Sequence, residues 1–144
     1  MKKIILSLLI GVISLFADFK SIDYKDIATK LGKDTVIIDI RTPREWAQTG
    51  IIPGSKKIMF FDEHRKYDTA KWLKEFSKYV KDKNQPFVLV CRTASRTKAV
   101  GRFLEQQGYK HIYDLKGGIT YGYIMQGYKT EGKTSKQPVF KGMM

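Results

Sequence analysis

The central segment of the chain reads Phe87-Val88-Leu89-Val90-Cys91-Arg92-Thr93-Ala94-Ser95-Arg96. Its first four residues are all apolar, which is typical of a short strand that is buried on both faces of a sheet. Residues 95–107 follow with apolar side chains at helical spacing, and Gly108 is a stop signal for that helix. Cys91 therefore lies where a buried strand passes into a helix.

Strands and helices alternate along the rest of the chain as well. The apolar spacing predicts helices over 21–31 and 68–80, strands over 35–40 and 111–115, and a shorter strand over 57–61. Pro43, Gly50, Pro53 and Gly54 mark the stretch between them as rich in turns. This order predicts an α/β fold, a single compact domain with a mainly parallel sheet and helices on both faces. Sites in such sheets form at the carboxyl ends of the strands, which is the position of Cys91.

The length of 144 residues suits one domain, preceded here by a leader. Lys2 and Lys3 are followed by an apolar run that ends at Ala17, the pattern of a secretory signal peptide cleaved after Ala17. The run is shorter than the roughly 20 residues of a membrane-spanning helix, so we expect no stable membrane span in the mature protein. A buried N-terminal helix and an uncleaved anchor are the alternatives. We thus predict a periplasmic protein with a signal peptide (1–17), one domain (18–128) and a basic C-terminal tail (129–144) that need not be ordered.

Charge narrows the class of partner. Without Lys2 and Lys3, 25 basic residues face 14 acidic ones, which gives a formal charge of +11. Such a field favours anionic small molecules, acidic proteins or anionic surfaces. The sequence has no helix-turn-helix, zinc-finger or aromatic-basic RNA motif, and export also argues against a nucleic-acid partner. His64 and His111 have no partner at metal-ligand spacing, so we predict neither a metal site nor a cofactor.

Cys91 is the only cysteine, so it cannot form an intrachain disulfide. It is a buried apolar residue, a point of intermolecular pairing or a reactive thiol, and composition alone does not choose among these. The loop after it favours a reactive thiol. Its backbone N–H groups and the N-terminal end of the following helix dipole stabilise an anion, so they favour a thiolate. Arg92 and Arg96 add guanidinium groups that can bind the oxyanion part of a donor such as thiosulfate.

Four motifs resemble those of rhodanese-like domains, in the order of that family. The loop from Cys91 to Arg96 is similar to its C-R-x-G-x-R active-site loop. The run from Asp39 to Trp46 resembles its D-x-R-x-x-x-E-aromatic signature, residues 50–55 its G-H-I-P-G-A turn, and residues 115–119 its closing L-x-G-G motif. The resemblance covers about residues 23–127, nearly the whole predicted domain. It implies the compact rhodanese fold with Cys91 as the catalytic cysteine.

The resemblance also implies a reaction. A sulfurtransferase of this kind moves a sulfane sulfur from thiosulfate or polysulfide to a thiophilic acceptor, for which cyanide serves as a test, through a persulfide on Cys91. The alternative is an exported carrier that hands its persulfide to a partner protein without significant turnover of thiosulfate. A phosphatase is disfavoured, because the phosphatases related to this fold have one more residue between cysteine and arginine than the four present here. The loop residues implied to bind the donor and the transferred sulfur are Arg92, Thr93, Ala94, Ser95 and Arg96.

Several of these residues also have structural interpretations. Cys91 can be a core thiol at a strand end, and Arg92 and Arg96 can be solvated residues at the start of a helix. An acid near the end of the strand predicted over 35–40 is followed by an arginine and a second acid, and we expect the three to fix the turn there through hydrogen bonds rather than to contact substrate. These residues, which we interpret as structural support, are Asp39, Arg41 and Glu45.

Two residues depart from the family pattern. Ala94 replaces the usual loop glycine, and if that position needs a positive φ angle, the alanine costs on the order of 1 kcal/mol. Ile51 replaces the histidine of the G-H-I-P-G turn, which removes a local hydrogen bond and leaves the cysteine chemistry unchanged. We also expect Cys91 to be an exposed thiolate, so that an active preparation needs reductant.

Overall fold

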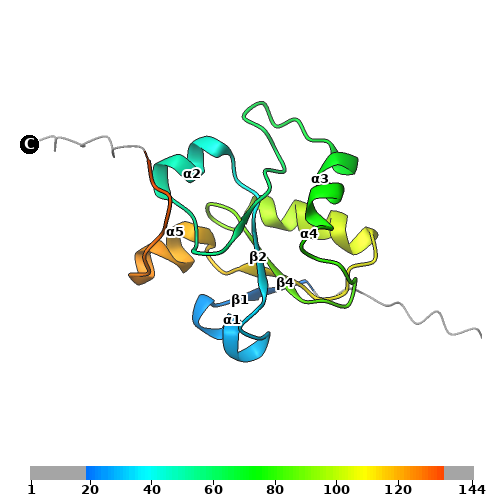
Figure 1. Cartoon of the computed structure of the whole chain (residues 1–144), viewed down its shortest axis with the longest axis horizontal. Helices are drawn as coiled ribbons and strands as arrows, with labels where there is room; N and C mark the ends of the chain where they lie inside the picture. The colour runs from blue at the N-terminus through cyan, green and yellow to red at the C-terminus, as the bar shows by residue number, and fades with distance from the viewer. Residues whose placement is uncertain (1–18, 135–144) are drawn as a thin grey trace, which may run out of the picture.

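The fold is built on one sheet of five parallel strands (Figure 1). The computed structural model describes residues 19–134. The strands lie in the spatial order β1-β5-β4-β2-β3, and every neighbouring pair is parallel. The strand before Cys91, β4, is therefore the central one. The bounds of the strands are β1 Lys20–Ile22, β2 Val36–Asp39, β3 Lys56–Lys57, β4 Phe87–Val90 and β5 Ile112–Leu115.

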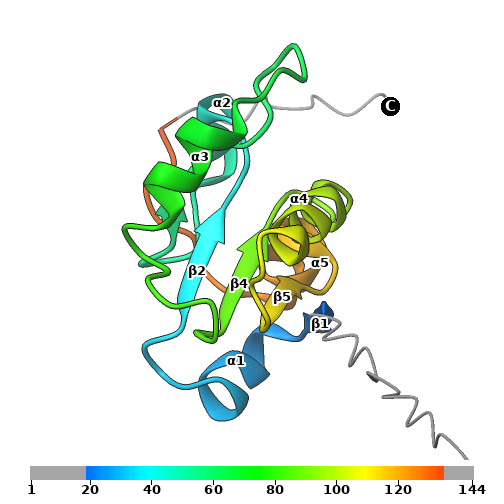
Figure 2. The same ribbon diagram turned by 90° about the vertical axis from the view of Figure 1, so that its right-hand side faces the viewer.

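Helices cover both faces of this sheet. α3 and α4 pack on one face, and α1 and α5 pack on the other (Figures 1 and 2). The predicted α/β architecture, with a parallel sheet and helices on both faces, is confirmed. The helices within the described residues are α1 Tyr24–Lys30, α2 Pro43–Thr49, α3 Thr69–Phe76, α4 Arg96–Gln106 and α5 Gly118–Gly122, followed by the short 3₁₀ helix η1 Ile124–Gln126.

The central strand β4 contributes to the core on both of its faces. Phe87 and Leu89 belong to the apolar cluster that includes residues of α3 and α4. Val88 and Val90 alternate with them and belong to the cluster that includes residues of α1 and α5. All four residues are buried. This double burial explains why the strand is a continuous apolar run rather than an alternating one.

The strands β1 and β3 differ from the prediction. β1 was not predicted: Ser21 and Ile22, which fall in the helix predicted over 21–31, belong to this strand, and α1 begins only at Tyr24. β1 pairs with β5, where Ser21 lies beside Asp114, 93 positions further along the chain. Such a short edge strand has no periodicity of its own, so only its distant partner defines it. The strand predicted over 57–61 overlaps the observed β3, Lys56–Lys57, only at Lys57.

The stretch after β2 that was predicted to be rich in turns contains the helix α2. Pro43 occupies the first turn of this helix, and Thr42 and Glu45 form a capping box in which each side chain binds the backbone N–H of the other. Both features are recognisable N-terminal signals. The prediction failed because α2 is short and has no buried residue, so it has no apolar stripe to reveal it.

The segment predicted as a tail is partly bound to the domain. The hydroxyl group of Thr130 donates to the carbonyl oxygen of Thr49 at 2.6 Å, and Glu131 and Ile51 exchange two backbone hydrogen bonds of 2.9 Å. The contacts extend to Thr134, at the end of the described range. The predicted signal peptide, 1–17, and residues 135–144 lie outside the described residues. Between residues 19 and 134, no helix has the length and apolar character needed to cross a membrane.

The core assignment can be tested at Leu104. This residue of α4 has no exposed surface and packs in the cluster on the α3 and α4 face. We expect Leu104→Ala to lower the free energy of unfolding by about 2–5 kcal/mol, because it removes buried methyl groups and leaves a cavity. Met125 is 67% exposed, so Met125→Ala should change that free energy by less than about 0.5 kcal/mol. Urea unfolding followed by circular dichroism measures both, and equal losses would contradict the assignment.

Candidate active site

Cys91 lies directly after β4, at the carboxyl edge of the sheet. Its side chain has no exposed surface and belongs to the core cluster on the α3 and α4 face. The thiol donates to the hydroxyl oxygen of Thr97, in the first turn of α4, over a Sγ to Oγ1 distance of 3.9 Å. The predicted position of Cys91 at the strand end is therefore confirmed, whereas its predicted exposure is wrong. The reason is that α4 and α5 both pack against this residue, which the sequence alone does not indicate.

The loop that follows Cys91 separates it from solvent. Arg92, Thr93 and Ser95 are exposed, and Arg96 is half-buried at the start of α4. Ala94 has a φ angle of 66°, so the position does require the left-handed conformation that a glycine would adopt more easily. The strain expected for an alanine in this conformation, on the order of 1 kcal/mol, therefore applies to Ala94.

Gly118 allows α5 to contact the backbone of this loop. The N–H of Ile119 donates to the carbonyl oxygen of Cys91 at 2.9 Å, and the N–H of Thr120 donates to that of Arg92 at 3.1 Å. A Cβ atom on Gly118 would overlap the carbonyl group of Arg92, and the φ angle of this glycine is 63°. The closing L-x-G-G motif therefore fixes the first two residues of the loop.

A second helix, α2, contacts the side chain at the end of the loop. The two terminal nitrogens of Arg96 donate to the two carboxylate oxygens of Glu45 at 2.8 and 2.6 Å. Burial opposes the charge of Glu45, but hydrogen bonds from Arg96 and from the backbone N–H of Thr42 hold its pKa below the usual value. The hydrogen bond to Glu45 is also the main reason that the pKa of Arg96 lies above its usual value. Both groups are therefore charged at neutral pH.

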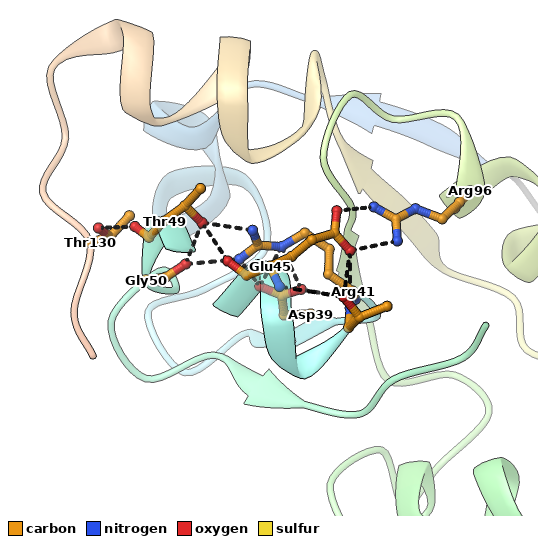
Figure 3. A network of polar contacts seen from close by, with 8 residues as sticks. Asp39, Arg41, Glu45, Thr49, Gly50, Arg96 and Thr130 are labelled. Atoms are coloured by element: carbon orange, nitrogen blue, oxygen red, sulfur yellow. Dashed lines mark hydrogen bonds and ion pairs between the residues drawn. The ribbon is translucent and has the colours of Figure 1, made fainter. Parts of the chain in front are cut away.

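A buried ion pair holds α2 in this position (Figure 3). Asp39 and Arg41 are both fully buried, and Nη2 of Arg41 lies 2.8 Å from the Asp39 carboxylate. The guanidinium group also donates to the Thr49 hydroxyl at 2.8 Å and to the Gly50 carbonyl at 2.9 Å, at the end of α2. This arrangement supports the structural interpretation of Asp39 and Arg41. Glu45 has an additional contact, because it reaches the loop.

A pocket of about 640 Å³ lies over the loop. Of the residues singled out from the sequence, the loop residues except Ala94 line this pocket, and so does Glu45. Cys91 lies behind the loop, and neither Asp39 nor Arg41 lines the pocket. The members of the predicted set that line the pocket are Glu45, Arg92, Thr93, Ser95 and Arg96.

The rest of the pocket wall was not predicted. It includes a turn after β3, in which Asp62 accepts the backbone N–H groups of His64 and Lys66 at 2.8 Å each and Arg65 has a φ angle of 60°. An aspartate that binds the backbone two residues on is a turn signal. Placing that turn beside the loop requires the parallel pairing of β2 with β3, which joins distant segments. The wall residues from this turn are Phe61, Asp62, Glu63 and Arg65.

The pocket is lined by groups that can hold an anion. Guanidinium groups come from Arg65, Arg92 and Arg96, and the carboxylate of Glu45 is already paired with Arg96. Guanidinium groups bind oxyanions through charge-assisted hydrogen bonds. Within residues 19–134, no cluster of three histidine, cysteine or acidic side chains offers a metal site.

Comparison with known families identifies the class of protein. The sequence model of the rhodanese-like domain matches residues 23–122. The chain belongs to this family. As a rhodanese-like domain, it is 31% identical over 103 residues to thiosulfate sulfurtransferase GlpE of Pseudoalteromonas translucida, a match that covers 71% of this chain and 87% of the relative. It is 33% identical over 101 residues to a sulfurtransferase of Allochromatium vinosum, covering 68% of this chain and 82% of the relative.

Solved structures share the fold of this rhodanese-like domain. The polysulfide-sulfur transferase homodimer from Wolinella succinogenes has a TM-score of 0.57 at 22% identity, covering 90% of this chain and 88% of that chain. A rhodanese-related protein from Thermoplasma volcanium has a TM-score of 0.53 at 26% identity, covering 76% of this chain and 94% of that chain. The family and the fold predicted from the four motifs are therefore confirmed.

The close contact at Gly118 can be tested with a matched pair of glycines. Gly127 has a φ angle of 90°, and no atom lies within 4 Å of the position that a Cβ would take, so Gly127→Ala introduces only left-handed strain of on the order of 1 kcal/mol. Gly118→Ala adds an overlap with the Arg92 backbone, and we expect it to cost about 1–3 kcal/mol more in urea unfolding. Equal losses of unfolding free energy in the two variants would contradict the close contact between Gly118 of α5 and the Arg92 backbone.

The Glu45–Arg96 ion pair should make stability depend on pH. The pKa of Glu45 is lower in the folded chain than in the unfolded chain, so the pair stabilises the fold at neutral pH, and this contribution is lost as the pH falls through the folded pKa. We expect Glu45→Gln to lower the free energy of unfolding by about 1 kcal/mol at pH 7 and by progressively less as the pH is lowered through the folded pKa of Glu45. Glu63→Gln, at an exposed position of the same pocket, is the control. A pH-independent loss in Glu45→Gln would show that the charge is not responsible.

Proposed function

We propose that this rhodanese-like domain is a sulfurtransferase that carries sulfur as a persulfide on Cys91. The observation that carries the proposal is the position of the only cysteine, at the end of the central strand and behind a loop with two arginines. The names of its relatives support the reaction class, since they include a thiosulfate sulfurtransferase and a polysulfide-sulfur transferase. We therefore propose thiosulfate and polysulfide as the two donor classes.

The proposed reaction balances without an external oxidant or reductant. The Cys91 thiolate attacks the outer sulfur of thiosulfate, a new S–S bond forms, and sulfite leaves with the electron pair of the S–S bond that breaks. Polysulfide reacts in the same way, and a polysulfide shortened by one sulfur leaves. A thiophilic acceptor then attacks the outer sulfur of the persulfide and regenerates the Cys91 thiolate.

Each part of the loop has a proposed role in this reaction. Arg92 and Arg96 bind the oxyanion or the terminal sulfur of the donor, because both line the pocket with cationic nitrogens. Thr93 and Ser95 line the same pocket and offer hydroxyl donors. Ala94 contributes its backbone, whose left-handed conformation turns the chain around the transferred sulfur. Glu45 orients Arg96 through the paired hydrogen bonds.

The decisive experiment is intact-protein mass spectrometry after incubation with thiosulfate or polysulfide. We expect the wild-type protein to gain the mass of one sulfur atom, and cyanide to remove it. Cys91→Ser, which keeps the size of the side chain but not the nucleophile, should gain none. Absence of sulfur on the wild-type protein with both donors would exclude the proposed function. When the full-length sequence is expressed and the exported protein is purified, the same mass spectrum also shows whether residues 1–17, the predicted signal peptide, have been removed.

A second function, that of an exported persulfide carrier, is favoured by one observation. Cys91 has no exposed surface, so a persulfide there would be shielded from small nucleophiles. The basic composition would suit docking to an acidic partner protein or capture of anionic polysulfide. The two functions differ in the fate of the loaded protein: rapid repeated production of thiocyanate from cyanide indicates an enzyme, and a persulfide that persists until a protein acceptor is added indicates a carrier.

A further inference from the structure

A buried chain of hydrogen bonds leads from Cys91 away from the pocket. The Cys91 thiol donates to Thr97 Oγ1, with 3.9 Å between the heavy atoms. The Thr97 hydroxyl donates in turn to a carboxylate oxygen of Asp114 at 3.0 Å. The other carboxylate oxygen of Asp114 accepts from the Ser21 hydroxyl at 2.6 Å. The thiol is thus connected to a carboxylate through a single hydroxyl group.

The fold places this carboxylate inside the protein. Asp114 lies on β5, beside Ser21 of β1 on one side and Leu89 of β4 on the other. Asp114 and Thr97 both have no exposed surface. Buried carboxylates are costly unless they are paired. Within residues 19–134, the hydrogen bonds of Asp114 come from two hydroxyl groups and none from a cation, in contrast to Asp39, which has Arg41.

The direction of the hydrogen bonds suggests what this carboxylate does. Thr97 has one proton, and it is committed to Asp114, so its oxygen can only accept from Cys91. A shift of each proton along the chain leaves Cys91 as a thiolate that accepts from Thr97, and Asp114 as a neutral acid. The shift moves protons within the buried site and leaves its net charge unchanged. No proton has to pass through the loop to solvent.

We propose that Asp114 is a positioning residue for the sulfur transfer, which takes the Cys91 proton through Thr97 as the sulfur atom attacks. This inference rests on the proposed function. In the step, the S–H bond of Cys91 breaks and a bond forms to Thr97 Oγ1, while the original Thr97 proton moves to Asp114. The Cys91 electron pair forms the new S–S bond, and sulfite or the shortened polysulfide leaves. When the acceptor removes the sulfur, the thiolate recovers its proton by the reverse shift.

Other charged groups near Cys91 do not offer the same route. The loop and the start of α4 bring Arg92 and Arg96, whose guanidinium groups offer donors but no acceptor for the proton. Glu45, on α2, is held by Arg96, and Asp39 and Arg41 at the end of β2 are paired with each other. These groups set the field around the thiol. Asp114 is the carboxylate among the described residues to which hydrogen bonds connect Cys91.

The test is the pH dependence of thiol alkylation by iodoacetamide, measured between about pH 5.5 and 7.5. When a thiol and a carboxylate share one proton, the reactive form is a fixed fraction of the pair, so the wild-type rate should change less than about twofold per pH unit. In Asp114→Asn the side-chain amide cannot take the proton, and in Thr97→Val the hydroxyl group is missing. Both rates should fall about tenfold for each unit of decreasing pH, because the proton must then go to water.

The matched control is Ser21→Ala, which removes the other hydrogen bond to Asp114 but leaves the relay intact. It should keep the shallow wild-type profile. Thermal melts by circular dichroism identify any variant that does not fold. If Asp114→Asn does not fold, the pH profiles of Thr97→Val and Ser21→Ala decide the question. Thr97→Val is expected to fold, because valine has nearly the shape of threonine.

Three results would overturn the relay: a tenfold slope in the wild type, a shallow slope in both Asp114→Asn and Thr97→Val, or a steep slope in Ser21→Ala. Alkylation needs no sulfur donor, so its outcome is independent of the sulfur-uptake experiment. A shallow wild-type slope that steepens in the two variants, in a protein that takes up no sulfur, would remove the proposed function and leave the proton relay in place.

Discussion

The arrangement of the candidate site depends on the buried guanidinium group of Arg41. The helix α2 has no buried residue, so no apolar face attaches it to the sheet. Arg41 provides the attachment by binding Asp39 at the end of β2 and the Thr49 and Gly50 oxygens at the end of α2. A buried charge is tolerated only when its donors are satisfied in this way. The start of α2 is consequently held where Glu45 meets Arg96.

The loop after Cys91 is therefore fixed from two directions. From α2, Glu45 holds the Arg96 side chain, and from α5, backbone N–H groups hold the carbonyl oxygens of Cys91 and Arg92. The left-handed Ala94 lies between these contacts, and a strained backbone persists where its surroundings determine it so completely. In the proposed function, groups placed in this way need not reorganise when an anion binds, which is the general advantage of a preformed site.

Much of this architecture follows from short-range patterns. The bounds predicted for β4 agree with the structure because its apolar run is continuous, and α4 is readily found from its apolar stripe and the glycine after it. Other elements had no such signal. β1 is defined by its pairing with β5, and α2 is held by polar contacts, so neither shows apolar periodicity. The wall around Arg65 joins the site only through the pairing of β2 with β3.

The sequence by itself determined the α/β class, the family and the position of Cys91 at the end of a strand, because strand, loop and helix are local patterns and the four motifs occur in order. It also indicated that Asp39 and Arg41 are structural. Only the tertiary structure decided that Cys91 is buried, that Glu45 binds Arg96, and that Asp114 and Ser21 lie behind the thiol. The physical reason is that burial and hydrogen bonding depend on the packing of parallel strands and helices, which brings together side chains that are distant in the chain.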